Sequence, residues 1–398
     1  MIINPLSRKK FIKNTLLSGI LISPATEITK LFAYEKYDAI SHREDPIGFG
    51  KSLGYSLPID LILLTATLAP NSHNTQPWKI KKISENAFEL YGDPNRLLPS
   101  IDPKERQFYH SQGTFLELAY LTADSLMYNA NIDLFPKGIP KSKDDLLRRP
   151  VARFSISAKH ECKHDFLFFA IKNRMMNRDV YSGDYLNTEI LNEIQTYAGL
   201  QFISAKFQTG EEAIARLNPI IVEAFDRELK SIPANEVTRI WFRLKDSELY
   251  QKRDGLCLEG NALSGLKLWF VRNFFMSLDH DFWHSDSTRK LTLDSFRKQV
   301  ESSKAYVCFI SNGSDSQKVW IETGRDFMRF SLACAAKGIA FHTMNQSLQD
   351  NEESKGFHEQ IAKEIGLKNN QRIQLLARLG RSDYMFSSPR RDLKDILL

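Results

Sequence analysis

The segment Ala69-Pro-Asn-Ser-His-Asn-Thr-Gln-Pro-Trp78 gathers several hydrogen-bonding side chains on a short stretch of chain. Such side chains can donate to and accept from the edge of a flat heteroaromatic ring. The two prolines restrict the backbone, and the tryptophan can anchor it in a core. A polar turn closed by prolines is the structural alternative for the same segment. The hydrogen-bonding candidates are Ser72, Asn74, Thr75 and Gln76.

Arginines form a second group of candidates, in Arg174-Met-Met-Asn-Arg178 and in Ser388-Pro-Arg-Arg391. A guanidinium suits a phosphate because its forked N–H groups match two phosphate oxygens. Two arginines four residues apart in the first turns of a helix can both face one dianion. We therefore expect the start of a helix at 174–178, with both arginines directed to a phosphate. A solvated helix face and a solvated tail are the alternatives.

Two histidine groupings have a spacing compatible with a metal ion, His160-x-Cys162-x-His164 and His280-x3-His284. Neither has a clear further set of ligands, and a zinc site usually takes three or four. We therefore expect no metal site. The cysteines are too few and too scattered for a disulfide framework. They are Cys162, Cys257, Cys308 and Cys334.

The composition is that of an ordinary globular protein, with 398 residues of which 42% are hydrophobic and 26% charged. It argues against disorder and against a polytopic membrane protein, and the length predicts two or three folding units. The net charge is +6, but four of the cations lie in the first 25 residues, and the remainder is only +2. We expect no nucleic-acid partner, because that remainder has no cationic stripe with interleaved aromatic residues.

Residues 1–25 have the three parts of an export signal. The cationic start Ser7-Arg-Lys-Lys-Phe-Ile-Lys13 precedes an apolar run over 15–22 and the triplet Ser23-Pro-Ala25. The run is shorter than the about 20 residues that a bilayer core takes, so we expect no integral membrane domain beyond the leader. The cationic start resembles the twin-arginine signal, with Lys9 in place of the second arginine. We expect a periplasmic protein whose leader is removed or retained as an anchor; a cytoplasmic chain is the alternative.

Apolar patterns place the candidates on a repeated order of helices and strands. Aligning Gly113 with Gly324 matches Leu121 with Leu332 and places both predicted helices before an apolar strand. A duplicated α+β module is the economical interpretation. The patterns predict helices over 59–68, 113–130 and 324–338, and strands over 79–83, 87–91, 151–157 and 372–379.

Residues 210–300 lie between the two copies, are rich in helix patterns and have no counterpart in the first copy. They contain the aromatic stretch Leu266-Lys-Leu-Trp-Phe-Val-Arg-Asn-Phe-Phe275. This stretch predicts a buried helix, with a cover over a pocket as the functional alternative.

The segment 69–78 resembles the flavin-contacting motif Pro-Ser-Ser-x-Asn-x-Gln-Pro-Trp of the nitroreductase family, with Asn71 in place of the first serine. The segment 174–178, followed by Tyr181, resembles the family's Arg-x-Ser-x-Arg-x-Phe segment, which grips the flavin phosphate. Met176 stands there in place of the hydroxyl residue.

Further resemblance extends over most of residues 58–391. Residues 324–340 are similar to the family's central helix and the turn that follows it. Residues 343–346 fall where related proteins lay backbone against the isoalloxazine ring, and 379–391 are similar to the terminal strand and basic tail. The string from Asp93 to Gly113 looks like the long, fused, Acg-like branch of the family.

The resemblance implies an α+β, nitroreductase-like fold in which two fused modules form an intrachain pseudo-dimer. Family dimers hold FMN in their interface, with the phosphate arginines from one subunit and the polar loop from the other. Here the loop survives in the first module and the arginines in the second, which implies one composite FMN site and a monomer. The expected parts are an export signal (1–25), a linker or wrapping arm (26–57), module 1 (58–158) and module 2 (159–398) with a helical insertion at about 210–300.

The resemblance also implies an FMN-dependent oxidoreductase. Such an enzyme would reduce a small aromatic acceptor, of quinone or nitro type, by two electrons from NAD(P)H or another reductant. A catalytically weak FMN-binding or sequestering protein with a closed pocket is the alternative. The flavin carries the chemistry, so we name no catalytic residue. The residues implied to bind FMN are Ser72, Asn74, Gln76, Pro77, Arg174, Asn177, Arg178, Thr343, Met344, Asn345, Gln346, Arg390 and Arg391.

Overall fold

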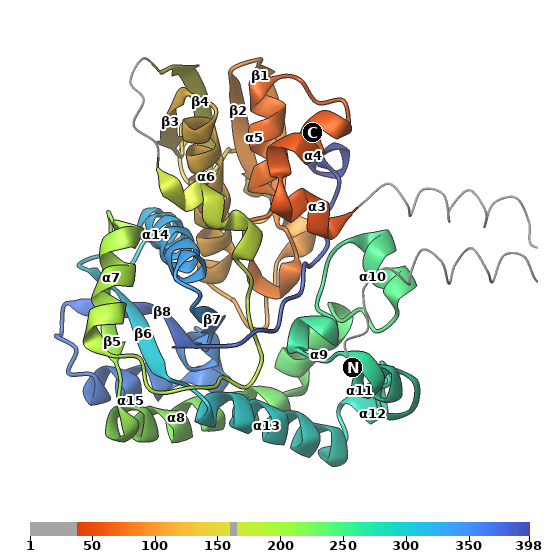
Figure 1. The fold of residues 1–398 in the computed structure, drawn as a ribbon, viewed down its shortest axis with the longest axis vertical. Helices are drawn as coiled ribbons and strands as arrows, with labels where there is room; N and C mark the ends of the chain where they lie inside the picture. The colour runs from red at the N-terminus through yellow and green to blue at the C-terminus, as the bar shows by residue number, and fades with distance from the viewer. Residues whose placement is uncertain (1–37, 160–164) are drawn as a thin grey trace, which may run out of the picture. The chain divides into compact units, whose positions relative to one another are not determined.

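Two antiparallel four-stranded sheets carry the fold (Figure 1). The first has the order β1-β2-β4-β3 and the second the order β5-β6-β8-β7, so both follow one strand order. In each sheet a long helix connects the second strand to the third. The α+β class expected from the sequence is confirmed. The strands are β1 Trp78–Ser84, β2 Ala87–Gly92, β3 Tyr128–Leu134, β4 Ala152–Ala158, β5 Ser204–Gln208, β6 Ala305–Asn312, β7 Ala340–Thr343 and β8 Gln371–Gly380.

The computed structural model describes residues 38–159 and 165–398. The leader at 1–25 and the grouping His160-x-Cys162-x-His164 therefore lie outside the described residues, and the export signal stays a prediction. Residues 39–398 form one compact unit. No helix within the described ranges is both long and apolar enough to cross a bilayer.

The connecting helices, α6 (Arg106–Ser125) and α14 (Gln317–Ala336), pack against each other along largely buried faces. Gly113 and Gly324 lie at their closest approach. A Cβ on Gly113 would lie 2.0 Å from the carbonyl oxygen of Ile321, and one on Gly324 would lie 2.1 Å from that of His110. Glycine is required at both positions because only a missing side chain lets the two backbones come so close. The two residues that the sequence aligned with each other thus meet at the centre of the molecule.

The predicted boundaries hold for most elements, with one clear error. The strands expected at 79–83, 87–91, 151–157 and 372–379 are present as β1, β2, β4 and β8. The helix expected over 113–130 ends at Ser125, and its last residues belong to β3 instead. The chain turns at Met127, whose φ of 66° is left-handed and cannot continue a helix.

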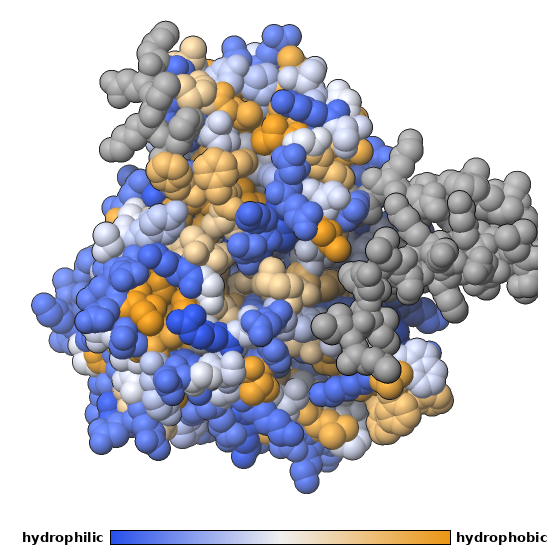
Figure 2. Space-filling model, in the orientation of Figure 1, coloured by the Kyte–Doolittle hydropathy of each residue, from blue (hydrophilic) through white to orange (hydrophobic). Residues whose placement is uncertain are grey.

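The 210–300 region forms a series of helices between β5 and β6. Its aromatic stretch is exposed: Leu266 keeps 87% of its surface, Phe274 65% and Trp269 57%. Hydrophobic side chains accordingly reach the surface over α11 and α12 (Figure 2). The prediction of a buried helix was therefore wrong, since nothing packs over this face within the described residues. The helices are α8 Glu211–Lys230, α9 Ile232–Ile240, α10 Asp246–Lys252, α11 Gly265–Phe270 with the π-helical turn Val271–Phe275, α12 His280–Trp283 and α13 Asp286–Glu301.

The chain ends by crossing from the second sheet to the first. After β8 it passes the cavity described below, forms α16 (Leu393–Ile396), and bridges β1 through Leu397 and Ile80. The segment expected to be a linker or arm contains two short helices. The remaining helices are α3 Ala39–Glu44, α4 Pro46–Ser52, α5 Pro58–Ala66, α7 Thr188–Ala198, α15 Phe357–Glu364 and the 3₁₀ turns Ser72–Asn74, Pro94–Arg96, Asp144–Leu147, Phe166–Asn173, Glu259–Asn261, Asn345–Leu348 and Glu352–Ser354.

The helix crossing makes a prediction about stability. Gly113→Ala and Gly324→Ala should each lower the free energy of unfolding by roughly 3 kcal/mol or more, because a backbone must move to admit the methyl group. Urea unfolding followed by far-UV circular dichroism measures this. Lys318→Ala, at a side chain of α14 that is 66% exposed, is the control and should change stability by less than about 0.5 kcal/mol. A free energy of unfolding equal to that of the wild type in both glycine variants would contradict the close approach of α6 and α14 at these residues.

Candidate functional site: a cavity lined with arginine

A cavity of about 230 Å³ lies beside the crossing of α6 and α14 and takes lining residues from both helices. Segments from both halves of the chain and from the 210–300 insertion complete its wall. Eight of the thirteen residues implied to bind FMN line this one cavity, so the structure brings the polar loop and the arginines together. These eight are Ser72, Asn74, Arg174, Arg178, Thr343, Asn345, Gln346 and Arg390.

The other five residues do not line the cavity; the side chains of Gln76, Asn177 and Arg391 instead hydrogen-bond to backbone groups. Gln76 is fully buried; its amide donates to the carbonyl of Arg253 (2.7 Å) and accepts from the backbone N–H of Arg391 (2.8 Å). The amide of Asn177 donates to the carbonyl of Tyr384 (3.0 Å). The last three are Pro77, whose carbonyl accepts from Gln112; Met344, in the core of the second sheet; and Arg391, which donates to the carbonyl of Asp395.

The loop before β1 has an unusual backbone. His73, Asn74 and Gln76 have φ values of 51°, 52° and 51°, in the left-handed region that non-glycine residues rarely adopt. Each such residue costs on the order of 1 kcal/mol or more, so the surroundings must hold the loop in this form. The insertion does so: Thr238 contacts the His73 ring at 3.0 Å, and the N–H of Gly255 donates to the carbonyl of Asn74.

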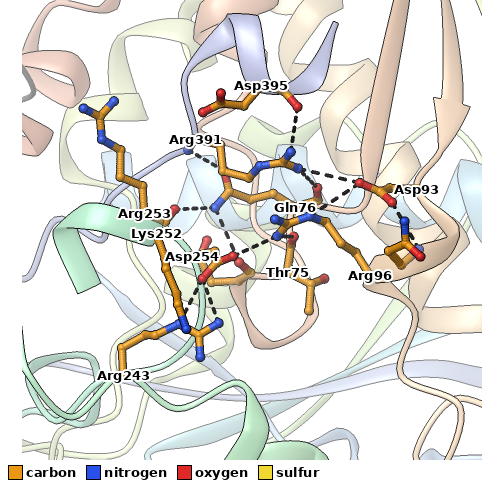
Figure 3. Close-up of polar contacts among 12 residues, drawn as sticks. Thr75, Gln76, Asp93, Arg96, Arg243, Lys252, Arg253, Asp254, Arg391 and Asp395 are labelled. Atoms are coloured by element: carbon orange, nitrogen blue, oxygen red, sulfur yellow. Dashed lines mark hydrogen bonds and ion pairs between the residues drawn. The ribbon is translucent and has the colours of Figure 1, made fainter. Parts of the chain in front are cut away.

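An ion-pair network fixes the far side of the same loop (Figure 3). Arg96 donates to the carbonyl of Thr75 (2.8 Å) and pairs with Asp254 (2.9 Å). Asp254 also accepts from Nε and Nη2 of Arg243. Since Arg243 and Asp254 belong to the insertion, the insertion and the first sheet are joined through this loop.

Buried positive charge is the strongest electrostatic feature of the cavity. Arg174 is 4% exposed, and its Nη1 has no hydrogen-bond partner among the described residues. Arg174 and Arg390 both donate to the carbonyl of Leu68, and Arg43 donates to the carbonyl of Arg174. Burial, and then Arg43 and Arg390, hold the pKa of Arg174 well below its ordinary value. No carboxylate of the described residues pairs with Arg174 or Arg178.

The arginine segment itself is not helical, contrary to expectation. A 3₁₀ turn ends at Asn173, and Arg174 follows with extended backbone (φ −77°, ψ 121°). Arg174 and Arg178 nevertheless line the same cavity. The sulfur of Met176, at the position of the family's hydroxyl, lies 3.4 Å from the backbone nitrogen of Thr343 and joins this segment to the end of β7.

Neutral polar groups line other parts of the cavity. Burial lowers the pKa of His110 well below its ordinary value, which keeps the imidazole uncharged at neutral pH. The amide oxygen of Gln346 is buried and has no partner within the described residues. An N–H donor on a ligand would satisfy it.

Among the described residues that line the cavity, one is an acid, and it lies on a helix of the insertion. Glu228 is 6% exposed and accepts a hydrogen bond from the amide of Gln349 at 2.7 Å. Burial first, and the nearby Glu353 second, raise the pKa of Glu228 to about 7. Glu228 therefore holds or releases a proton near neutral pH.

The position in the second half of the chain that corresponds to this part of the cavity wall is occupied by an ion-paired side chain. Alignment of the two glycines pairs Thr114, which lines the cavity, with Arg325. Arg325 forms an ion pair with buried Glu117 (2.7 Å) and stacks over Phe202, with its guanidinium carbon 5.0 Å from the ring centre. A second ligand of the same kind would have to displace a buried ion pair.

The sequence analysis did not identify several of the residues that line the cavity. For one group of them, the sequence contains a recognisable pattern. Gln107, Ser111 and Thr114 recur at helical spacing on α6, where the other buried positions are mostly apolar. Such a polar stripe on a core helix indicates a lined cavity. No sequence pattern pointed to Arg43, because its segment was expected to be a linker. None pointed to Glu228, because the insertion has no counterpart in the first module with which to compare it.

No protein-family model matches the chain. Two proteins of Mycobacterium tuberculosis whose names class them as NAD(P)H nitroreductases, from strains CDC 1551 / Oshkosh and ATCC 25618 / H37Rv, are each 35% identical to it over 75 residues. The match covers 19% of this chain and 22% of each relative. The chain thus matches about a fifth of the length of these curated relatives.

Solved structures of nitroreductases are more distant. A nitroreductase-like family protein from Bacillus cereus is 13% identical at a TM-score of 0.33, over 57% of this chain and 92% of that one. An FMN-dependent nitroreductase from Mycobacterium smegmatis, in complex with NADPH, is 14% identical at 0.36, over 57% and 94%. A nitroreductase with bound FMN from Desulfitobacterium hafniense DCB-2 is 12% identical at 0.34, over 58% and 96%. TM-scores at this level do not by themselves establish a shared fold.

Glu228 makes a prediction about the pH dependence of stability. Its pKa lies near 7 in the folded protein and near 4.5 in the unfolded chain, so the folded state binds the proton more tightly. The free energy of unfolding should therefore fall as pH rises between these two values, by an amount on the order of 3 kcal/mol from this group. Glu228→Gln should lose this component, which is measured as the wild-type-minus-variant difference in urea unfolding across that pH range. An equal pH dependence in both proteins would contradict it.

Proposed function

We propose that the cavity binds one FMN, with the phosphate against Arg174 and its neighbouring arginines. The observation that carries the proposal is the buried Nη1 of Arg174, which has no hydrogen-bond partner in the described part of the chain, while Arg43 and Arg390 add further positive charge. A phosphate dianion would supply both the missing acceptor and the counter-charge, and buried charges are otherwise costly.

The remaining lining fits the other parts of a flavin. The free amide oxygen of Gln346 could accept from the N–H on the pyrimidine edge of the ring, and Asn74 offers both a donor and an acceptor. These are the positions that the resemblance to nitroreductases assigns to the cofactor. The cavity of about 230 Å³ lies just under the roughly 300–1,000 Å³ of small-molecule sites. Bound FMN would thus fill the cavity and leave little empty volume in it.

The function that this site supports best is an FMN-dependent oxidoreductase of nitroreductase type. Bound FMN would supply two-electron chemistry between NAD(P)H or another reductant and an acceptor of quinone or nitro type. The chain's own residues would hold the cofactor: the arginines fix its phosphate and Gln346 its ring edge. The insertion walls the cavity and restricts water. The names of the two Mycobacterium tuberculosis relatives class those proteins as NAD(P)H nitroreductases, which supports this proposal.

A second function, FMN binding with little turnover, is favoured by one observation. The insertion contributes Glu228, Gly255, Leu256, Cys257 and Gly260 to the wall of a cavity that is already small. A substrate that must stack on the flavin would then have no room unless the insertion moves.

The phosphate site makes the first prediction of this proposal. Purified protein should be yellow or become so with FMN, and Arg174→Gln should weaken FMN binding by about tenfold or more. Riboflavin, which lacks the phosphate, should bind the wild type about as weakly as FMN binds the variant. Flavin fluorescence quenching measures both affinities. Arg297→Gln, at an exposed position of α13, is the matched control and should bind FMN as the wild type does.

Equal affinity of the wild type for FMN and riboflavin would exclude a phosphate site at Arg174. Protein that stays colourless after incubation with FMN would exclude both flavin functions.

Reduction by nicotinamide separates the two functions. Anaerobic mixing of the FMN-loaded protein with NADH or NADPH in a stopped-flow instrument should bleach the flavin absorbance, and a quinone should restore it. Bleaching and recovery support the oxidoreductase. A flavin that resists NADH, NADPH and small chemical reductants supports sequestration and contradicts the enzyme.

A further inference from the structure

The insertion brings three metal-ligating side chains together, away from the cavity. His280 and His284 lie one turn apart at α12, with ring centres 4.7 Å from each other. Glu236 faces them from α9, and one ligand atom from each of the three residues lies within 4.8 Å of the others. The sequence showed only the histidine pair, because Glu236 is 44 residues earlier in the chain.

The contacts of the three side chains are specific. Nε2 of His284 lies 2.9 Å from Oε2 of Glu236, and this histidine side chain is only 7% exposed. Its other ring nitrogen, Nδ1, is buried without a hydrogen-bond partner in the described residues. His280 is 54% exposed and contacts Asp281 through Nδ1 at 3.0 Å. For the other ring nitrogen of His280, Nε2, the described residues offer no hydrogen-bond partner.

We infer that Glu236, His280 and His284 form a binding site for a divalent transition-metal ion such as Zn²⁺. Zinc binds imidazole nitrogen and carboxylate oxygen at about 2.0–2.2 Å, which places neighbouring ligand atoms somewhat more than 3 Å apart. The present spacing reaches this arrangement through a rotation of the exposed His280 side chain. The ion would lie between His284 and Glu236, in place of their direct contact. Two imidazoles and one carboxylate suit zinc, cobalt or nickel better than magnesium or calcium.

Two charged neighbours modify the site. Asp281, on one ring nitrogen of His280, is the kind of carboxylate that orients a metal-bound histidine through its other nitrogen. Arg239 opposes binding, because it donates to both oxygens of Glu236 (2.6 and 2.7 Å) and carries a positive charge. Arg239 also donates to the carbonyl of Leu278, so it can keep that anchor while one oxygen turns to the metal.

A metal here would join two parts of the insertion. It would link α9 to α12, which are already connected by the hydrogen bond from the indole of Trp283 to Asn235 (3.0 Å). α9 carries Thr238, the residue that holds His73 of the cavity loop. The ion would therefore stiffen the wall of the cavity without touching its contents.

The test uses untagged protein in which His160→Ala, Cys162→Ser and His164→Ala remove the other metal-compatible grouping of the sequence. Titration with ZnCl₂ by calorimetry should show one saturable site, and Co²⁺ should give the visible absorption of imidazole-bound cobalt. His280→Ala should weaken Zn²⁺ binding by about tenfold or more, because it removes one of three ligands. His284→Ala should do the same, and Zn²⁺ should raise the melting temperature of the parent but not that of these two variants.

Arg239→Gln provides a variant with the opposite expectation, since removal of the competing cation should tighten Zn²⁺ binding. His280 is exposed, so His280→Ala keeps the fold and remains informative even where His284→Ala does not fold. Unchanged Zn²⁺ affinity in His280→Ala overturns the proposal, as does the absence of saturable Zn²⁺ binding in the parent.

Discussion

The close approach of α6 and α14 at Gly113 and Gly324 is the constraint on which the rest of the structure depends. It joins the two halves through backbone contact and leaves no freedom in their separation or register. The cavity lies beside this crossing, so residues from both halves reach it at fixed positions. The symmetry is not complete: beside the same crossing, Thr114 faces the cavity while Arg325 is paired with Glu117. The position at Thr114 therefore has space for a ligand, and the position at Arg325 is filled by its ion pair with Glu117.

Arg174 is a buried guanidinium near other arginines, and its Nη1 has no hydrogen-bond partner within the described residues. Burying an unpaired charge is costly, which is why we propose an anion in the cavity. Several segments hold this arrangement in place: the loop before β1 has left-handed residues that the insertion contacts, and the tail supplies Arg390 before it reaches the first sheet. Costly geometry that converges on one cavity from several segments is typical of a binding site.

The sequence predicted the elements better than the contacts. Periodic apolar patterns located β1, β2, β4, β8 and both central helices, and the dense motif at 69–78 located the cavity loop. The predicted helix at 174–178 was wrong because spacing alone does not distinguish a helix from an extended segment that also aims two arginines at one place. Gln76 is the residue type that nitroreductases have at this position of the motif. Here its side chain hydrogen-bonds to backbone, because the insertion places the carbonyl of Arg253 beside it. The insertion has no counterpart in the first module, so its sequence did not indicate that Glu228 lines the cavity or that Glu236 faces the two histidines. The boundaries of the two modules stay a prediction.

The central claim is that this chain forms a single composite flavin site. Native mass spectrometry of the protein, incubated with excess FMN and transferred to a volatile buffer, counts the cofactor directly. We expect one FMN per chain, because no carboxylate of the described residues pairs with Arg174, while Arg325 at the matching position pairs with Glu117. Two FMN molecules per chain, or none at saturating FMN, would contradict it.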